Sequence, residues 1–287
     1  MKILVTGGTG TVGSRVVARL AQRGVPTRVL TRSDQKARDL PRGIEGVVGN
    51  MEERSPLRDL FAGCDRMFLL TPVSPTEVGQ GRNAAIVAAE LEMRHVVFLS
   101  VHDVEKGEHI PHFKSKLEIE RVLNENGVPT TVVMPNNFFQ NDLWLRDAIA
   151  GQGVYPQPLG SAHCLSRIDA GDIADAVVRL LATDQEPGRR VPLVGPDCLS
   201  GPACAAAWAR HLGRPVRYMG DDLGVWATRV GESMPEWLVK DLTTMYAFFQ
   251  QNGLAASEAD LRATQGVLGR APRSFDDWVG ETAADWK

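Results

Sequence analysis

The chain has 287 residues, which is enough for one large domain or two domains of ordinary size. Its 32 basic and 35 acidic residues give a formal net charge of −3 without a long basic run, which excludes the profile of an electrostatic nucleic-acid binder. Hydrophobic residues make up 43% and charged residues 23%, as in globular rather than disordered proteins. No stretch approaches the ~20 apolar residues of a membrane span, and the first apolar run is too short for a secretion signal. We therefore expect a cytoplasmic protein without nucleic-acid or membrane partners.

Apolar runs typical of buried strands alternate with helical patterns through the first two thirds of the chain. The strands are expected at Lys2–Thr6, Thr27–Thr31, Val47–Val48, Met67–Leu70, His95–Leu99 and Thr130–Met134. Helices are expected along Val12–Leu20, from Ser55 with Pro56 at the first helical position, along Ala84–Leu91, along Phe113–Asn126, and from Asp169 to Leu181. This alternation predicts an α/β protein with a Rossmann-type, doubly wound parallel sheet.

The composition changes after about residue 184, because five of the six tryptophans lie beyond residue 200. We expect a nucleotide-binding domain over residues 1–183, with insertions after about residue 150, and a smaller, mostly helical substrate lobe over 184–287. The segment from Trp226 to Phe249 is rich in aromatic residues and methionine. It is either the lobe's own core or the wall of an apolar ligand cleft.

The four cysteines form no CxxC pair, and their spacing gives no set of metal ligands. We expect reduced thiols at Cys64, Cys164, Cys198 and Cys204. His109 and His112 form an HxxH pair without an evident third ligand, so no metal site is expected.

A glycine-rich turn follows the first expected strand and opens the first expected helix. Glycines permit a tight turn and a close approach to phosphate oxygens, and the helix amides attract negative charge. The alternative is a glycine-rich turn that binds no ligand. The predicted pyrophosphate contacts are Gly7, Thr9, Gly10, Thr11, Val12 and Gly13.

Arg32 stands about 20 residues after this turn, where an acidic side chain would accept hydrogen bonds from the ribose of NAD. A guanidinium at that position favours a 2′-phosphate, so NADP is expected before NAD. The alternative is an exposed arginine at a strand end, and Asp34 is close enough to weaken the inference.

Several further segments carry a family resemblance, the most specific being the HFxSKxxxE and PxxFFxN patterns. The segments are Gly7–Gly13, Arg32, Gly49–Met51, Leu69–Pro72, His112–Glu120, Met134–Asn141 and Ile168–Ala174. Over essentially its whole length, the chain resembles the NmrA-like branch of the atypical short-chain dehydrogenases/reductases, with relatives among quinone and isoflavone reductases. The resemblance implies a nicotinamide cofactor along the carboxyl ends of the strands, with the substrate above it.

The resemblance also implies individual cofactor contacts. These are Asn50 and Met51 near the adenine, Leu70, Thr71 and Pro72 beside the ribose and nicotinamide, Lys116 at the nicotinamide ribose, and Pro135, Asn136 and Phe138 over the nicotinamide. Two positions depart from the family pattern, because Asn50 stands where relatives often have aspartate and Met134 where many have arginine.

The tyrosine that most members of this superfamily use as a proton donor is missing, because no tyrosine is followed by lysine four residues later. The corresponding pair is His112 and Lys116, which share one helix face, whereas Lys114 is expected to face solvent. His112 either protonates the substrate or only packs at the helix start while water supplies the proton. Ser100 ends the fifth strand at the position of the superfamily's serine and is either catalytic or a simple strand-end hydroxyl.

Substrate contacts are expected from Asn137, Phe139, Trp226 and Trp237, although the phenylalanine could instead belong to the core. The leading hypothesis is an NAD(P)H-dependent reductase of a planar conjugated acceptor, such as a quinone, an enone or a polycyclic aromatic of secondary metabolism. The alternatives are a redox sensor that binds NADP and acts through a protein partner, and an epimerase or ketoreductase. A homodimer is also possible.

Overall fold

The computed structural model describes residues 1–182 and 187–286, and the chain divides into two compact units. The first unit consists of Met1–Glu108, His112–Met134 and Ala170–Val191. The second unit consists of His109–Pro111, Pro135–Asp169 and Pro192–Lys287. The expected boundary between residues 183 and 184 falls outside the described residues.

A seven-stranded sheet has the order β3-β2-β1-β4-β5-β6-β8. Its strands are β1 (Ile3–Thr6), β2 (Thr27–Thr31), β3 (Ile44–Val48), β4 (Arg66–Leu69), β5 (His95–Leu99), β6 (Thr130–Pro135) and β8 (Arg190–Leu193). Each neighbouring pair from β3 to β6 is parallel. The predicted Rossmann-type sheet is therefore confirmed, and the two residues expected to form the third strand lengthen to five.

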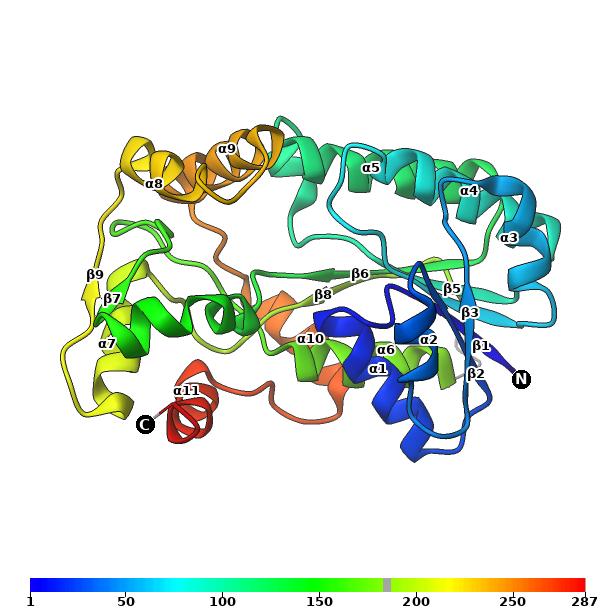
Figure 1. The fold of residues 1–287 in the computed structure, drawn as a ribbon, viewed down its shortest axis with the longest axis horizontal. Coiled ribbons are helices and arrows are strands. Elements are labelled where there is room, and N and C mark those ends of the chain that lie inside the picture. Colours follow the sequence, from blue (N-terminus) through cyan, green and yellow to red (C-terminus); the bar gives the residue numbers. More distant parts are fainter. Residues whose placement is uncertain (183–186, 287) are drawn as a thin grey trace. The chain divides into compact units, whose positions relative to one another are not determined.

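Helices cover both faces of this sheet (Figure 1). They are α1 (Thr11–Gln22), α2 (Asp34–Arg38), α3 (Arg54–Phe61), α4 (Glu77–Glu90), α5 (Pro111–Glu125) and α6 (Ala170–Ala182), with a short 3₁₀ helix, η1, at Val104–Gly107. Residues from α3, α4 and α5 share one buried cluster with strand residues such as Leu4 and Phe98. Because the central strands are covered on both faces, they read as continuous apolar runs. Helix α3 begins at Arg54, with Glu53 at its N-cap, so the N-cap expected at Ser55 and the first helical residue expected at Pro56 were each two residues late.

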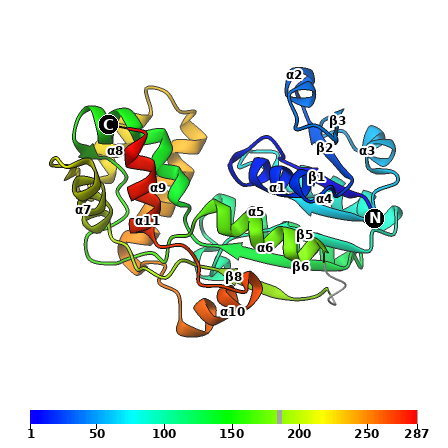
Figure 2. The same ribbon diagram turned by 90° about the horizontal axis from the view of Figure 1, so that it is seen from below.

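Helices α1 and α6 lie side by side on the opposite face of the sheet (Figures 1 and 2). The predicted apolar stripe of α1 is fully buried, as Val16 and Leu20 show. Arg19 of α1 forms an ion pair with Asp175 of α6 and donates a hydrogen bond of 3.0 Å to the Gly171 carbonyl. Residues about 150 positions apart in sequence thus meet in this layer.

The second unit is mostly helical. It contains η2 (Phe139–Leu145), η3 (Asp147–Gly151), β7 (Val154–Tyr155), α7 (Gly201–Leu212), β9 (Arg217–Tyr218), α8 (Leu223–Val230), α9 (Glu236–Asn252), α10 (Glu258–Leu268) and α11 (Phe275–Ala284). Strands β7 and β9 form a separate parallel pair. Aromatic rings fill its interior, with Trp208 stacked on Trp286 at 4.4 Å and edge-on to Trp278 at 5.7 Å.

A fully buried ion pair anchors this interior. Arg167 Nη2 donates to Asp142 Oδ1 at 2.8 Å, and both side chains are 0% exposed. The same carboxylate also accepts hydrogen bonds from the Tyr155 hydroxyl at 3.0 Å and from Trp208 Nε1 at 2.9 Å. Four side chains from separate segments therefore satisfy one another away from water.

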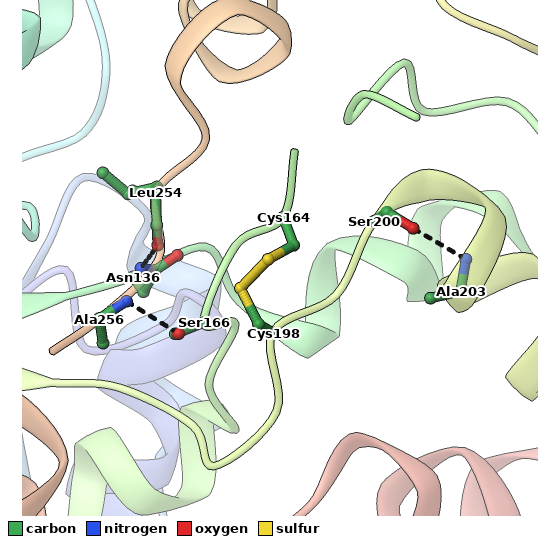
Figure 3. Close-up of a disulfide and its surroundings, with 8 residues drawn as sticks. All are labelled: Asn136, Cys164, Ser166, Cys198, Ser200, Ala203, Leu254 and Ala256. Carbon is green, nitrogen blue, oxygen red and sulfur yellow. Dashed lines mark hydrogen bonds between the residues drawn. A yellow bond between two sulfur atoms is a disulfide. The ribbon is translucent and has the colours of Figure 1, made fainter. Parts of the chain in front are cut away.

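A disulfide joins Cys164 and Cys198, which corrects the expectation of four reduced thiols (Figure 3). The cysteines are 34 residues apart, but an antiparallel bridge between Leu165 and Leu199 brings their Cα atoms to 5.2 Å. This separation is suitable for a disulfide, and sequence spacing alone could not reveal it. Cys64 and Cys204 are free and buried, and burial raises the pKa of the Cys204 thiol to about 11.

Within residues 1–182 and 187–286, no helix is long and apolar enough to cross a membrane. In the same described residues, no group of three or more His, Cys, Asp or Glu side chains could hold a metal ion.

Candidate cofactor site

The order of the strands reverses at β1, which lies between β2 and β4. In open α/β sheets, the crevice outside the carboxyl ends of the strands at such a switch point is where ligands bind. The glycine-rich turn follows β1, and Leu70 and Thr71 follow β4. The first unit therefore brings these predicted contacts to the same edge of the sheet.

The fold itself requires several glycines in this turn. Gly7 has a φ of +62°, and a Cβ there would lie 2.6 Å from Leu70 Cδ2. A Cβ on Gly13 would lie 2.1 Å from the Gly7 carbonyl oxygen, which no backbone shift of ordinary size could relieve. Both positions keep the turn tight against the sheet.

Gly10 is different, because the nearest atom to a Cβ there is the Gly7 carbonyl oxygen at an ordinary 3.4 Å. Gly10 is exposed and is the N-cap of α1, yet no side chain in the described part of the protein caps this helix, and no acidic residue lies in its first turn. The first amides of a helix have no acceptor within it. They remain suited to bind an anion, with Thr9 exposed and Thr11 half-buried beside them.

The predicted adenine-side residues follow β2 and β3. Arg32 is exposed directly after β2, where its guanidinium is accessible to a phosphate. Asn50 Oδ1 accepts a hydrogen bond from the Glu52 amide at 3.2 Å. Met51 is buried, and its carbonyl accepts a hydrogen bond from Asn83 Nδ2 at 2.9 Å. Local hydrogen bonds thus shape the loop after β3.

Lys116 lies on α5 and is buried in a cluster with Thr71 and Glu77. Its ammonium is 2.6 Å from Glu77 Oε1, 2.9 Å from Thr71 Oγ1 and 5.6 Å from the centre of the Phe98 ring. The Thr71 hydroxyl donates to the same Glu77 oxygen at 2.7 Å. A cation is therefore held by a carboxylate and a hydroxyl at the carboxyl edge of the sheet.

His112 and Ser100 have separate surroundings. His112 is 9% exposed near the start of α5, with its ring edge-on to Phe113 at 4.9 Å. The Ser100 hydroxyl donates a hydrogen bond of 2.5 Å to Glu120 Oε1, and burial raises the pKa of that carboxyl despite this bond. Lys114 is exposed, as expected.

Pro135, Asn136 and Phe138, predicted as cofactor contacts, and Asn137, predicted as a substrate contact, lie in the second unit. Asn136 Nδ2 donates to the Leu254 carbonyl at 2.7 Å (Figure 3). Asn137 Oδ1 accepts from Arg167 Nε at 2.9 Å, and the Phe138 carbonyl accepts from Arg167 Nη2 at 2.8 Å. Pro135 is buried at the end of β6.

The aromatic residues expected at the substrate differ in exposure. Phe139 is 0% exposed and packs edge-on against Phe275 at 5.1 Å, so its ring belongs to the core of the second unit. Trp226 is 8% exposed and packs edge-on against Tyr246 at 4.9 Å. Trp237 is 39% exposed, which leaves part of its ring accessible.

Glu77 is the site residue that sequence reasoning missed. It directly follows Thr76, and the polar pair Thr76–Glu77 is typical of an ordinary helix start. The only available signal was its place six residues after Thr71, in the segment that follows a strand expected to contact the cofactor.

The fold and this edge define a Rossmann-type protein built to bind a dinucleotide. Residues 1–278 match the NmrA-like family, so the chain belongs to that family. It is 34% identical over 285 residues to an NAD(P)H azoreductase of Xenophilus azovorans, with 98% of each chain covered. The same identity, length and coverage relate it to a (4-alkanoyl-5-oxo-2,5-dihydrofuran-3-yl)methyl phosphate reductase of Streptomyces griseus.

The structure is also similar to an Escherichia coli NADPH-dependent quinone oxidoreductase solved with NADPH. The TM-score is 0.87 at 20% identity, over 98% of this chain and 99% of the other. The family predicted from the sequence is confirmed, and these relatives support the predicted enzyme class, an NAD(P)H-dependent reductase.

Proposed function

We propose that the protein is an NADPH-dependent reductase that transfers a hydride to a planar, conjugated acceptor. The observation that carries this proposal is the uncapped start of α1, behind a turn whose glycines the fold requires, at the switch point of the sheet. Two relatives that are 34% identical over nearly the whole chain and are named as reductases support it. The bound cofactor would supply the hydride.

The residues of the first unit divide the work of binding. The main-chain amides at the start of α1 would hold the pyrophosphate, and exposed Arg32 would pair with the 2′-phosphate. Lys116 would donate a hydrogen bond to the nicotinamide ribose. Each of these groups is a cation or a hydrogen-bond donor, as an anionic, hydroxyl-rich ligand requires.

The acceptor class follows from what the chain lacks. A ketone needs a strong proton donor when its carbonyl is reduced, and the superfamily's tyrosine is absent here. A conjugated acceptor spreads the incoming negative charge over its π system, so His112 or water is a sufficient proton source. The names of the relatives, an azoreductase and a reductase of an unsaturated lactone, agree with such acceptors. Ser100, whose hydroxyl is bonded to Glu120, would then hold α5 against β5 rather than bind substrate.

Gly10→Thr tests the nucleotide site without damaging the fold. A Cβ fits at Gly10, and a threonine N-cap would accept a hydrogen bond from the helix amides that the phosphate needs. We expect an unchanged or slightly higher melting temperature and at least tenfold weaker NADPH binding by calorimetry. Gly79→Thr is the control. Gly79 lies in α4, and a Cβ added there would have no atom within 4 Å, so this variant should leave binding unchanged.

Turnover is measured by NADPH oxidation against a panel of azo dyes, quinones and enones, with NADH in parallel. The proposal expects reduction of at least one acceptor and tighter binding of NADPH than of NADH. Tight NADPH binding without reduction of any acceptor would instead favour the redox-sensor hypothesis. No binding of either nucleotide at millimolar concentration would overturn both.

A further inference from the structure

Thr71, Glu77 and Lys116 form one cluster. Thr71 and Lys116 are predicted cofactor contacts, whereas Glu77 is not. Glu77 begins α4 and is 1% exposed, whereas Lys116 is on α5 and is 5% exposed. The desolvation cost of a buried ammonium without a partner is a large fraction of the net free energy of unfolding of a whole domain. Glu77 therefore supplies the charge that lets Lys116 stay inside as a cation.

The hydrogen bonds in the cluster can be assigned donor by donor. The Thr71 hydroxyl has one hydrogen, which goes to Glu77 Oε1 at 2.7 Å, so its lone pair must face Lys116 Nζ at 2.9 Å. Lys116 also donates to Glu77 Oε1 at 2.6 Å. These two bonds use two of its three hydrogens. Among the residues that the structure describes, the third has only the Thr71 carbonyl, at a long 3.5 Å, so it is the one available to a ligand.

Glu77 itself is not fully satisfied. Its second oxygen, Oε2, is buried and has no hydrogen-bond partner among the described residues. An unsatisfied buried carboxylate oxygen carries a desolvation cost that no hydrogen bond offsets. A pair selected for stability alone would avoid this cost, and buried ion pairs are in any case weak contributors to stability. The arrangement fits a residue retained for the geometry it imposes on Lys116.

We propose that Glu77 is a positioning residue, which fixes the Lys116 ammonium so that its remaining N–H is directed at the ribose of a bound nicotinamide nucleotide. This inference rests on the proposed function. Glu77 touches neither nucleotide nor acceptor in this role and acts through Lys116 and Thr71 alone. Thr71 follows the carboxyl end of β4, Glu77 lies on α4 and Lys116 lies on α5. The cluster is therefore at the edge of the sheet where the strand order reverses.

The test compares Glu77→Gln with Glu90→Gln, which is the same substitution on the same helix in an exposed ion pair with Arg54. Glutamine keeps the shape of the side chain and removes its charge. For Glu77→Gln we expect about tenfold weaker NADPH binding at pH 7, as for loss of one charge-assisted hydrogen bond. Glu90→Gln should keep the wild-type affinity.

A double-mutant cycle separates positioning from general destabilisation. If Glu77 acts through Lys116, Glu77→Gln added to Lys116→Met causes no further loss of NADPH affinity. Glu77→Asp keeps the charge but shortens the side chain, so it should recover part of the affinity that Glu77→Gln loses. It also serves as the readout if Glu77→Gln does not fold.

Two results would overturn the inference while leaving the proposed function intact. One is a Glu77→Gln variant with a lower melting temperature but wild-type NADPH affinity. The other is additive losses in the cycle with Lys116→Met. Failure of the wild-type protein to bind NADPH would instead overturn the proposed function itself, so the two failures are distinguishable.

Discussion

The two units of the chain are stabilised by different kinds of contact. In the first, the critical contacts are between backbone atoms and glycines, such as Gly13 against the Gly7 carbonyl, and between regular apolar strands and helices. In the second, they are between side chains far apart in sequence, namely the Arg167–Asp142 pair, stacked tryptophans and a disulfide. A nucleotide site can be built from a local backbone pattern, whereas the second unit, which has little regular sheet, depends on long-range side-chain partners.

The largest effect expected from this comparison is in the second unit, on breaking its buried ion pair. Asp142→Asn removes the charge opposite Arg167, which is 0% exposed, and so strands a buried guanidinium. We expect a loss of about 3–5 kcal/mol in the free energy of unfolding, measured by urea denaturation. Asp276→Asn, in an exposed pair with Arg210, should cost less than about 1 kcal/mol. Equal losses in the two variants would contradict the view that buried side-chain pairs hold the second unit together.

Reduction of the disulfide is the next prediction. The bridge closes a segment of 34 residues, for which chain entropy gives a stabilisation of about 3–4 kcal/mol. Wild-type protein should therefore unfold at lower urea concentration when a reductant is added. The Cys164→Ala/Cys198→Ala double variant should unfold at the same concentration with and without reductant. A wild-type transition that does not respond to reductant would argue that the bridge contributes nothing.

Gly13→Ala probes the backbone of the first unit. Its Cβ would lie 2.1 Å from the Gly7 carbonyl oxygen, so the turn must distort. Overpacking of this kind costs about 3 kcal/mol, and NADPH binding should be lost with the turn. A Cβ added at Gly79 in α4 would have no atom within 4 Å, so Gly79→Ala should leave the free energy of unfolding unchanged or raise it by about 0.5–1 kcal/mol. Tolerance of alanine at residue 13 would show that the turn is not fixed by its glycines.

The smallest expected effect is a pH dependence within the first unit. Burial, reinforced by Arg66, lowers the pKa of His95 from 6.5 to about 4, and the ring bonds Thr131 Oγ1 at 2.8 Å. The unfolded chain thus binds the proton more readily, so this contribution to stability is complete above pH 6.5 and is lost as the pH falls toward 4. Between pH 7 and pH 5 the loss is about 2 kcal/mol. The difference in unfolding free energy between wild type and His95→Gln should shrink by that amount over this range, and a constant difference would refute the assignment.

The parts of the site that could be predicted are those that depend on neighbours in sequence. The turn after β1, the exposed Arg32 and the placement of Lys116 on a helix follow from local spacing and from the family resemblance. The partner of Lys116 does not, because Glu77 meets it only when α4 and α5 pack on the same face of the sheet. For the same reason, Phe139 could be read equally well as a substrate contact or as core until its packing against Phe275 was known.

The sequence by itself determined the doubly wound sheet, the glycine turn and the family, since strand and helix periodicity and backbone freedom are local properties of the chain. Only the tertiary structure decided which buried polar groups are paired, that Cys164 and Cys198 are bonded, and which aromatic rings are covered. These depend on distances between residues up to dozens of positions apart. The fold decides which side chain lies beside a buried charge or thiol, and local sequence patterns do not contain that information.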